Sequence, residues 1–190
     1  MFQKNKKNFF IMIILGSMLM GCGNGENTSG FTVSEPSQMP DIVFMDIIDY
    51  TETAQEGDNQ FAITFYDKNG NHYTSTDAYV CGLKYEELVT EYAAGNLKDK
   101  ITFHTTCDVD ELFENYQKLC EVSENKEFEI IYPEAIPTVQ ANRISWYGIY
   151  YDKDGEMQIQ KIQESGAGGR YEANDEQANE IYNWYIGTFQ

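Results

Sequence analysis

Histidine is almost absent from this chain of 190 residues, which contains only His72 and His104. Neither histidine lies in a zinc-binding spacing such as His-x-x-x-His, and no Cys-x-x-Cys pair accompanies them. His104 and Cys107 are three residues apart, so on one continuous strand their side chains would point to opposite faces. The sequence therefore gives no support for a zinc site or a cysteine–histidine nucleophile, and we expect no metal and no cofactor.

Basic residues are scarce as well. The chain has 13 Lys and Arg against 31 Asp and Glu, which gives a formal net charge of −18. Binding to nucleic acid draws much of its affinity from basic side chains that contact phosphates, so we exclude nucleic acid as a partner. Anionic lipid headgroups should be repelled for the same reason. The acidity is typical of well-solvated protein surfaces.

Long hydrophobic runs are missing too. The longest, Phe9 to Met20, falls short of the about 20 residues that a helix needs to cross a membrane core of roughly 30 Å. Lys4, Lys6 and Lys7 precede it. A basic start followed by a short apolar run is typical of a cleavable signal peptide, so we expect residues 1–21 to be removed.

The apolar run ends in Leu19-Met20-Gly21-Cys22. This segment resembles the lipobox of bacterial prolipoproteins, in which an aliphatic residue, a tolerant position and a small residue precede a cysteine. The resemblance covers residues 1–22 only. It implies that the Cys22 thiol receives a diacylglyceryl group and that Cys22 becomes the mature N-terminus. Two acyl chains hold a protein stably, so the resemblance places the protein outside the cytoplasm, lipid-anchored to a Gram-positive cell membrane or to an outer membrane.

The mature chain would contain residues 22–190, with ten basic and 31 acidic residues and a formal net charge of −21. Residues 22–40 are polar and rich in Gly, Ser, Asn and Pro, which is typical of a flexible tether behind the lipidated cysteine. We expect residues 41–190 to form a single α+β domain, which is long enough to bury a core of its own.

Three cysteines remain after lipidation: Cys81, Cys107 and Cys120. If the segment after Asp108 is helical, Cys107 and Cys120 lie 13 helical steps apart, or roughly 20 Å. A disulfide bond tolerates a Cα separation of only about 7 Å, so this pair is excluded. A bond from Cys81 to either of the others stays open. A cysteine on an apolar helix stripe, such as Cys120, is typically a small buried hydrophobe.

Two hairpins are predicted by the same turn sequence. Asp67-Lys68-Asn69-Gly70 lies between two β-prone segments, and Asp152-Lys153-Asp154-Gly155 lies between two others. Asp begins a type I turn, and Gly adopts the positive φ that closes a short hairpin loop. Further strands are expected at 42–50, 101–106 and 127–132.

Apolar residues recur at the helical period in three segments. The predicted helices lie at 85–92, before Gly95; at 109–120, after Asp108 as N-cap; and at 178–185, opened by Asn174 or Asp175. Hairpins followed by separate helices predict an α+β fold, a mainly antiparallel sheet with about three helices on one face. Residues 102–132 could instead form one βαβ unit with a parallel strand pair.

Aromatic residues offer the best indication of a binding surface. Strand alternation places Trp146 and Tyr150 on one face of the strand at 144–151 and Tyr147 and Tyr151 on the other. If helices cover one face of the sheet only, Tyr147 and Tyr151 are exposed, and Tyr-rich surfaces suit recognition of proteins or glycans. The ordinary alternative is that these rings are sheet packing.

A glycine-rich stretch, residues 166–170, ends in Arg170, one of only two arginines in the mature chain. It lacks the spacing of a phosphate-binding loop, so a flexible connector is the ordinary interpretation. Arg170 remains a candidate for contact with an anionic ligand group.

No catalytic constellation stands out, so the sequence favours a membrane-anchored domain that binds an extracellular protein, peptide or glycan. The alternative is a cell-envelope hydrolase that uses acidic residues such as Glu86, Glu87 or Asp108. A concave group of acids with perturbed pKa values would favour the hydrolase, whereas a Tyr-rich sheet face would favour binding.

Overall fold

The computed structural model describes residues 35–51, 53, 55, 60–132, 142–166 and 169–188. The expected signal peptide, Cys22 and residues 23–34 of the tether lie outside this part of the chain. Among the described residues, no helix combines the length and the apolar character that crossing a membrane requires.

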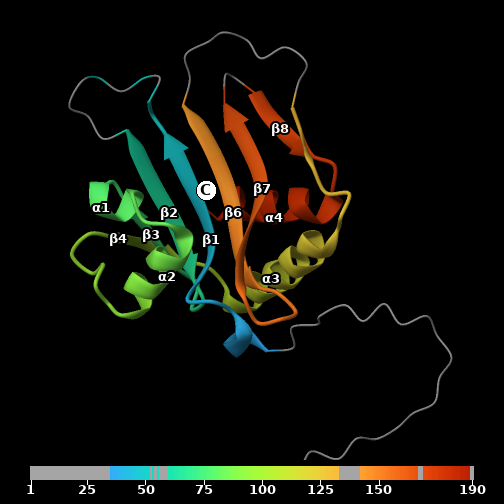
Figure 1. The fold of residues 1–190 in the computed structure, drawn as a ribbon, viewed down its shortest axis with the longest axis horizontal. Coiled ribbons are helices and arrows are strands. Elements are labelled where there is room, and N and C mark those ends of the chain that lie inside the picture. Colours follow the sequence, from blue (N-terminus) through green and yellow to red (C-terminus); the bar gives the residue numbers. More distant parts are fainter. Residues whose placement is uncertain are drawn as a thin grey trace, which may run out of the picture.

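A single antiparallel sheet runs through the domain in the order β4-β3-β2-β1-β6-β7-β8-β5 (Figure 1). Its strands are β1 (Ile42–Asp49), β2 (Phe61–Asp67), β3 (Asn71–Ser75), β4 (Thr102–Thr106), β5 (Ile130–Ile131), β6 (Arg143–Tyr151), β7 (Met157–Gly166) and β8 (Gly169–Ala173). The helices are α1 (Ala78–Cys81), α2 (Tyr85–Ala93), α3 (Val109–Glu124) and α4 (Glu176–Gly187), and a short 3-10 helix, η1 (Pro36–Gln38), precedes β1. The predicted α+β class with a mainly antiparallel sheet is confirmed.

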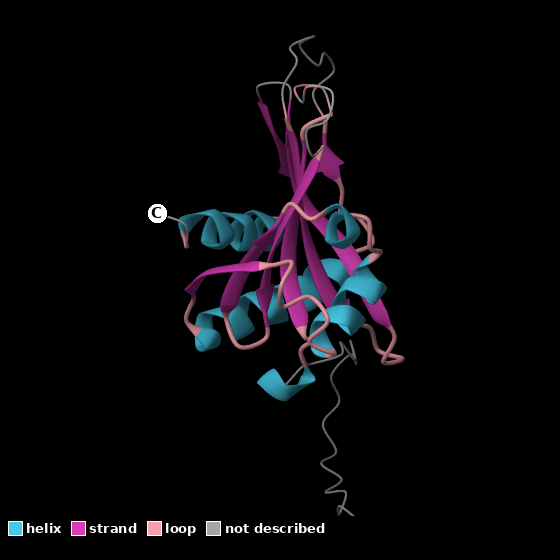
Figure 2. Cartoon of the chain, turned by 90° about the vertical axis from the view of Figure 1, so that its left-hand side faces the viewer, coloured by secondary structure: helices cyan, strands magenta, loops and turns pink. Residues whose placement is uncertain are grey.

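The helices lie on both sides of the sheet, so the prediction that they cover one face is wrong (Figure 2). Phe44 of β1 packs in a core with α3 and α4, whereas its neighbour Met45 packs in a second core with α1 and α2. Adjacent strand residues point to opposite faces, so the sheet is buried between two helical layers. The side of the sheet that packs against α3 and α4 is called the α3/α4 face, and the side that packs against α1 and α2 is called the α1/α2 face.

Both predicted hairpin turns are present. Gly70 and Gly155 have φ values of 79° and 80°, which most side chains resist. In each turn the first aspartate accepts hydrogen bonds from two backbone N–H groups further along: Asp67 from residues 69 and 71, and Asp152 from residues 154 and 156. These bonds fix the turns that join β2 to β3 and β6 to β7.

The predicted helices are confirmed as α2, α3 and α4. Asp108 caps α3 by accepting from the N–H groups of residues 110 and 111, and Asp175 rather than Asn174 caps α4. Helix α1 was not predicted, because four residues are too few to show a helical period, although its N-cap Asp77 follows the same rule.

The βαβ alternative for residues 102–132 is wrong, because β4 and β5 lie at opposite edges of the sheet. The described ends of the glycine-rich stretch belong to strands, because Gly166 of β7 pairs with Gly169 of β8.

The folded part starts slightly before the predicted boundary at residue 41, because Met39 is only 3% exposed and packs in the α3/α4 core. The same core shows a close approach between helix and sheet. A Cβ added to Gly148 of β6 would overlap the side chain of Leu119 in α3. Only glycine lets α3 pack this closely on β6.

Candidate ligand-binding site

An apolar cavity of about 220 Å³ lies on the α1/α2 face, between the sheet and the segment that joins α1 to α2. Tyr147, one of the predicted ligand-binding residues, lines this cavity. The other walls include Ile47 of β1, Ile63 of β2, Leu83 and Tyr85 beside the helices, and Ile159 of β7. We call it the Tyr147 cavity.

Strand register explains why these side chains meet. Ile47 lies opposite Ile63 on one side and Ser145 on the other, and Tyr147 follows Ser145 by two residues. Ile159 lies opposite Ile149, two residues beyond Tyr147. Positions two apart on a strand share a face, so residues from four strands form one apolar floor.

A row of charged side chains borders this floor. Glu164 is 4% exposed, and its carboxylate accepts a hydrogen bond from Lys161 Nζ at 2.6 Å and lies 3.6 Å from Arg143 Nε. Tyr132 donates its hydroxyl hydrogen bond to the same carboxylate at 3.3 Å. Asp49 lies directly opposite Arg143 across the β1–β6 ladder. Two acids and two bases therefore balance in this row.

Lys161 links the charged row to the cavity, because its Nζ lies 5.7 Å from the centre of the Tyr147 ring. Burial by itself would lower the pKa of Lys161, but the hydrogen bond and the charge of Glu164 outweigh burial and raise it. Lys161 therefore remains a cation above the aromatic wall, in a cation–π arrangement.

Tyr147 and Tyr151 do not share an open face, which corrects the prediction of a Tyr-rich exposed surface. Tyr147 is partly buried and packs in the α1/α2 core, because α1 and α2 cover the face that was expected to be open. Tyr151 borders a separate hollow of about 440 Å³, with Lys126 and Lys153, between the end of α3 and the β6–β7 turn.

Arg170 lies in β8, opposite Ser165 of β7. Its side chain is outside the described part of the chain, so its candidacy for an anion contact stays a prediction. The hairpin places its backbone on the far side of β7 from Tyr147.

Two of the three acids considered for hydrolysis have structural roles. Glu87 accepts a hydrogen bond from the N–H of Lys84 at the start of α2, and Asp108 caps α3. Glu86 is exposed on α2. Among the described residues, no group of three or more His, Cys, Asp or Glu is placed to hold a metal ion.

Cys81, Cys107 and Cys120 are all free thiols, which closes the alternative of a disulfide from Cys81. Cys81 lines the Tyr147 cavity, and burial raises the pKa of its thiol. A raised pKa disfavours the reactive thiolate, so Cys81 serves the cavity as an apolar wall.

One perturbed acid, Asp46, was not predicted as a special residue. It lies in β1 on the α3/α4 face, 5% exposed, and accepts hydrogen bonds from the hydroxyl groups of Thr64 and of Tyr185 in α4, the latter at 2.6 Å. Burial raises its pKa to about 6, against the effect of the two hydrogen bonds. A carboxyl group sealed under α4 cannot reach a substrate, so its role is in packing.

No protein family matches this chain, and neither a curated protein nor a solved structure is similar to it. The candidate site itself consists of an apolar cavity, the cation of Lys161 at its wall and a charge-balanced polar border.

Proposed function

We propose that this protein is a bacterial surface lipoprotein, held to the outer face of a membrane by diacylglyceryl-Cys22, whose domain binds an extracellular ligand. The lipobox-like segment and the preceding signal-peptide pattern support the anchor. The acidic domain offers little attraction to anionic headgroups, so the lipid would supply most of the membrane attachment.

The observation that carries the binding role is the Tyr147 cavity. At about 220 Å³ it is smaller than most drug-sized ligand pockets, which start near 300 Å³. It therefore suits one apolar group of a larger ligand, such as an aliphatic or aromatic side chain of an extracellular protein or peptide. Polar parts of that ligand would meet the bordering row of Arg143, Lys161 and Glu164.

The position of the tether agrees with this role. Helix η1 lies at the end of the sheet where β1 begins, next to both Asp-Lys-Asx-Gly turns (Figure 1). Arg143 and Phe61 lie at the opposite end, beside the last residue of β1. The 13 residues between Cys22 and Pro36 span at most about 45 Å, so the anchored domain would present this opposite end to the surroundings.

The hydrolase alternative has no specific support from the described residues. The most perturbed carboxyl group, Asp46, is sealed by α4, and Glu164 is ion-paired with Lys161. A general acid and base would need two accessible carboxyl groups at a common cleft.

To test this proposal, small apolar probes, indole and cyclohexanol, are titrated into the full chain. Methyl NMR spectra report where they bind. We expect shifts of the methyl groups of Ile47, Ile63, Leu83 and Ile159, because these line the cavity. The cavity-filling variant Ile159→Trp should weaken probe binding at least about tenfold. Ile131→Trp, at a residue 53% exposed on β5, is the matched control and should leave binding unchanged. Equal binding by both variants would refute the assignment of the cavity.

A further inference from the structure

Strand β4 forms one edge of the sheet, and all five of its residues are exposed. We propose that this edge docks an extended segment of a partner protein, which pairs antiparallel with β4 and carries Lys or Arg near its own N-terminal end. The proposal is independent of the Tyr147 cavity and concerns a second surface of the domain.

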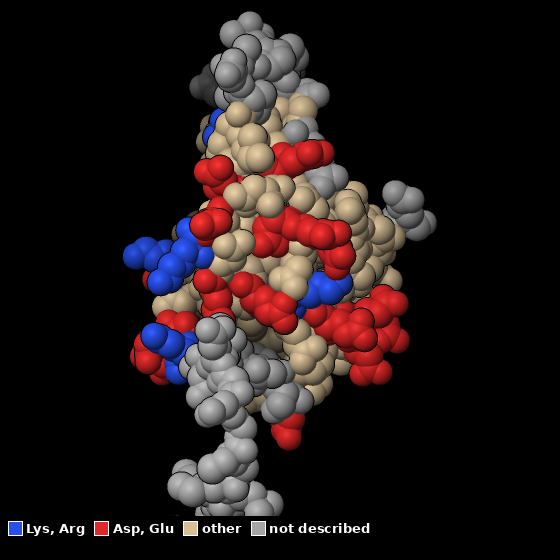
Figure 3. All heavy atoms as spheres, turned by 90° about the vertical axis from the view of Figure 1, so that its right-hand side faces the viewer, with Lys and Arg blue, Asp and Glu red and all other residues tan. Residues whose placement is uncertain are grey.

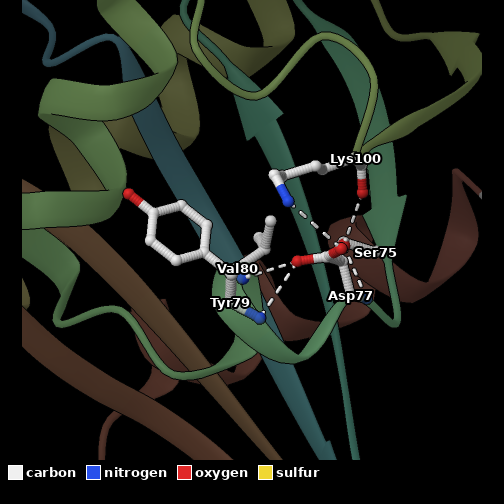
Figure 4. A network of polar contacts seen from close by, with 5 residues as sticks. All are labelled: Ser75, Asp77, Tyr79, Val80 and Lys100. Atoms are coloured by element: carbon white, nitrogen blue, oxygen red, sulfur yellow. Dashed lines mark hydrogen bonds and ion pairs between the residues drawn. The ribbon is translucent and has the colours of Figure 1, made fainter.

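The edge is held in place at both ends, which favours strand addition by limiting the entropy lost on binding. At its start, Ser75 of β3 donates a hydrogen bond to the backbone oxygen of Lys100, and Lys100 Nζ lies 3.4 Å from Asp77, the N-cap of α1 (Figure 4). At its end, the N–H of Cys107 donates to the oxygen of Gly70 at 2.9 Å.

Natural edge strands are usually protected by charged side chains, proline or bulges. From Ile101 to Cys107 this chain has no Lys, Arg, Asp, Glu or Pro, although 23% of all residues are charged. One bulge is present, where the β3–β4 register shifts between His72 and Tyr73. The strand is thus β-prone, exposed and largely unprotected, which are the properties of sheet edges that accept an added strand.

A groove beside β4 could take side chains of the added segment. It has a volume of about 530 Å³, and its walls include the rings of Tyr73, Tyr92 and Phe103. Phe103 is 53% exposed and lies 5.8 Å from Tyr73, centre to centre. Strand addition uses main-chain hydrogen bonds for affinity and such pockets for specificity, so an aromatic or aliphatic side chain of the segment would lie here.

Charge specifies the orientation. The C-terminal end of β4 leads into exposed Asp108, Asp110 and Glu111, whereas Lys98 and Lys100 accompany Asp99 at the N-terminal end. An antiparallel segment places its N-terminal end beside the acidic end of β4, so basic residues are favoured there. Figure 3 shows the opposite side of the molecule, away from β4, where acidic side chains are also more widespread than basic ones. The mature charge of −21 opposes a second copy of the chain as the occupant.

The test starts with a phage library of random nonapeptides, selected on the full chain purified in detergent. Selected peptides should alternate β-branched or aromatic residues with polar ones and have Lys or Arg near the N-terminus. The best peptide should slow amide hydrogen exchange at residues 102–106 on binding, because the added strand would engage the backbone of β4. Methylation of alternate amide nitrogens in the peptide should weaken binding at least about tenfold.

Two variants and one control localise the binding. Phe103→Ser and Asp110→Lys should each weaken binding of the selected peptide at least about fivefold. The control Asp154→Lys, in the exposed β6–β7 turn, should change the affinity less than about twofold. Thermal melts confirm that each variant is folded. Selection of no peptide, or equal binding by all three variants, overturns the proposal. Sedimentation that shows a dimer dissociated by Phe103→Ser would also overturn it, because a second copy would then occupy the edge.

Discussion

Asp46 should make the stability of this domain depend on pH in a direction unusual for an aspartate. Its carboxylate is buried under α4 and accepts hydrogen bonds from Tyr185 and Thr64. Burial raises its pKa from 3.8 to about 6. A difference of this size corresponds to about 3 kcal/mol, by which the ionised group destabilises the folded state at neutral pH.

The direction follows from the raised pKa. The folded state binds the Asp46 proton more tightly than the unfolded state does, so protonation stabilises the fold. This contribution is fully present below about pH 4 and is lost as the pH rises through about 6. The chain contains 30 other acidic residues, so the pH dependence of the wild type alone does not isolate Asp46.

The assay compares the wild type with Asp46→Asn, which can still accept the hydrogen bonds of Tyr185 and Thr64 but cannot ionise. Urea unfolding at several pH values gives the difference in free energy of unfolding, in which the other acids cancel. As the pH falls from about 8 to about 4, the difference should shift by about 2 kcal/mol in favour of the wild type, because at pH 4 the unfolded state also binds part of this proton. Asp152→Asn is a control of opposite sign, because backbone hydrogen bonds, first from Glu156, lower the pKa of the Asp152 carboxyl group. Parallel pH profiles of the wild type and Asp46→Asn would refute the reasoning.

The remaining predictions concern packing and turns, and urea unfolding measures each of them. Gly155→Val should cost at least about 1 kcal/mol through positive φ, and Gly70→Val should cost more, because its Cβ would lie 2.7 Å from a backbone oxygen. Equal losses of stability in the two variants would contradict the larger effect predicted for Gly70→Val. Gly148→Ala should lower the free energy of unfolding by about 1 to 3 kcal/mol, because the added methyl group overpacks against Leu119. The double variant Gly148→Ala, Leu119→Ala should lose less than the sum of the losses in the two single variants. Strict additivity would show that the two residues do not touch. Tyr147→Ser should lower the free energy of unfolding, because the ring packs in the α1/α2 core; an unchanged value would mean that the ring lies on an open surface.

Local features of the fold could be predicted because the responsible residues are close in sequence. The turn glycines, the N-cap aspartates and the helical stripes all act over a few positions. Which face each helix covers depends on contacts between distant segments. One signal of the two-sided core was available: residues 42–45 of β1 form an uninterrupted apolar run, which is typical of a strand buried on both faces.

Much of the candidate site was beyond prediction from sequence. Tyr147 was identified from its strand, but Lys161 and Glu164 are three residues apart and by alternation should point to opposite faces. The β6–β7 register shifts between Trp146 and Tyr147, and this bulge brings both side chains to the same face. Such an irregularity depends on the pairing of two strands.

The proposed lipid anchor on Cys22 would place the domain outside the cell, and the proposed binding role depends on that location. Lipidation of Cys22 can be measured by mass spectrometry of the N-terminal peptide, from protein extracted from its native membranes. We expect a chain that begins at Cys22 and carries a diacylglyceryl group, and a Cys22→Ser variant that carries no lipid and is released from the membrane. An unmodified N-terminal residue in the wild type, or retention of residues 1–21, would contradict the proposed anchor.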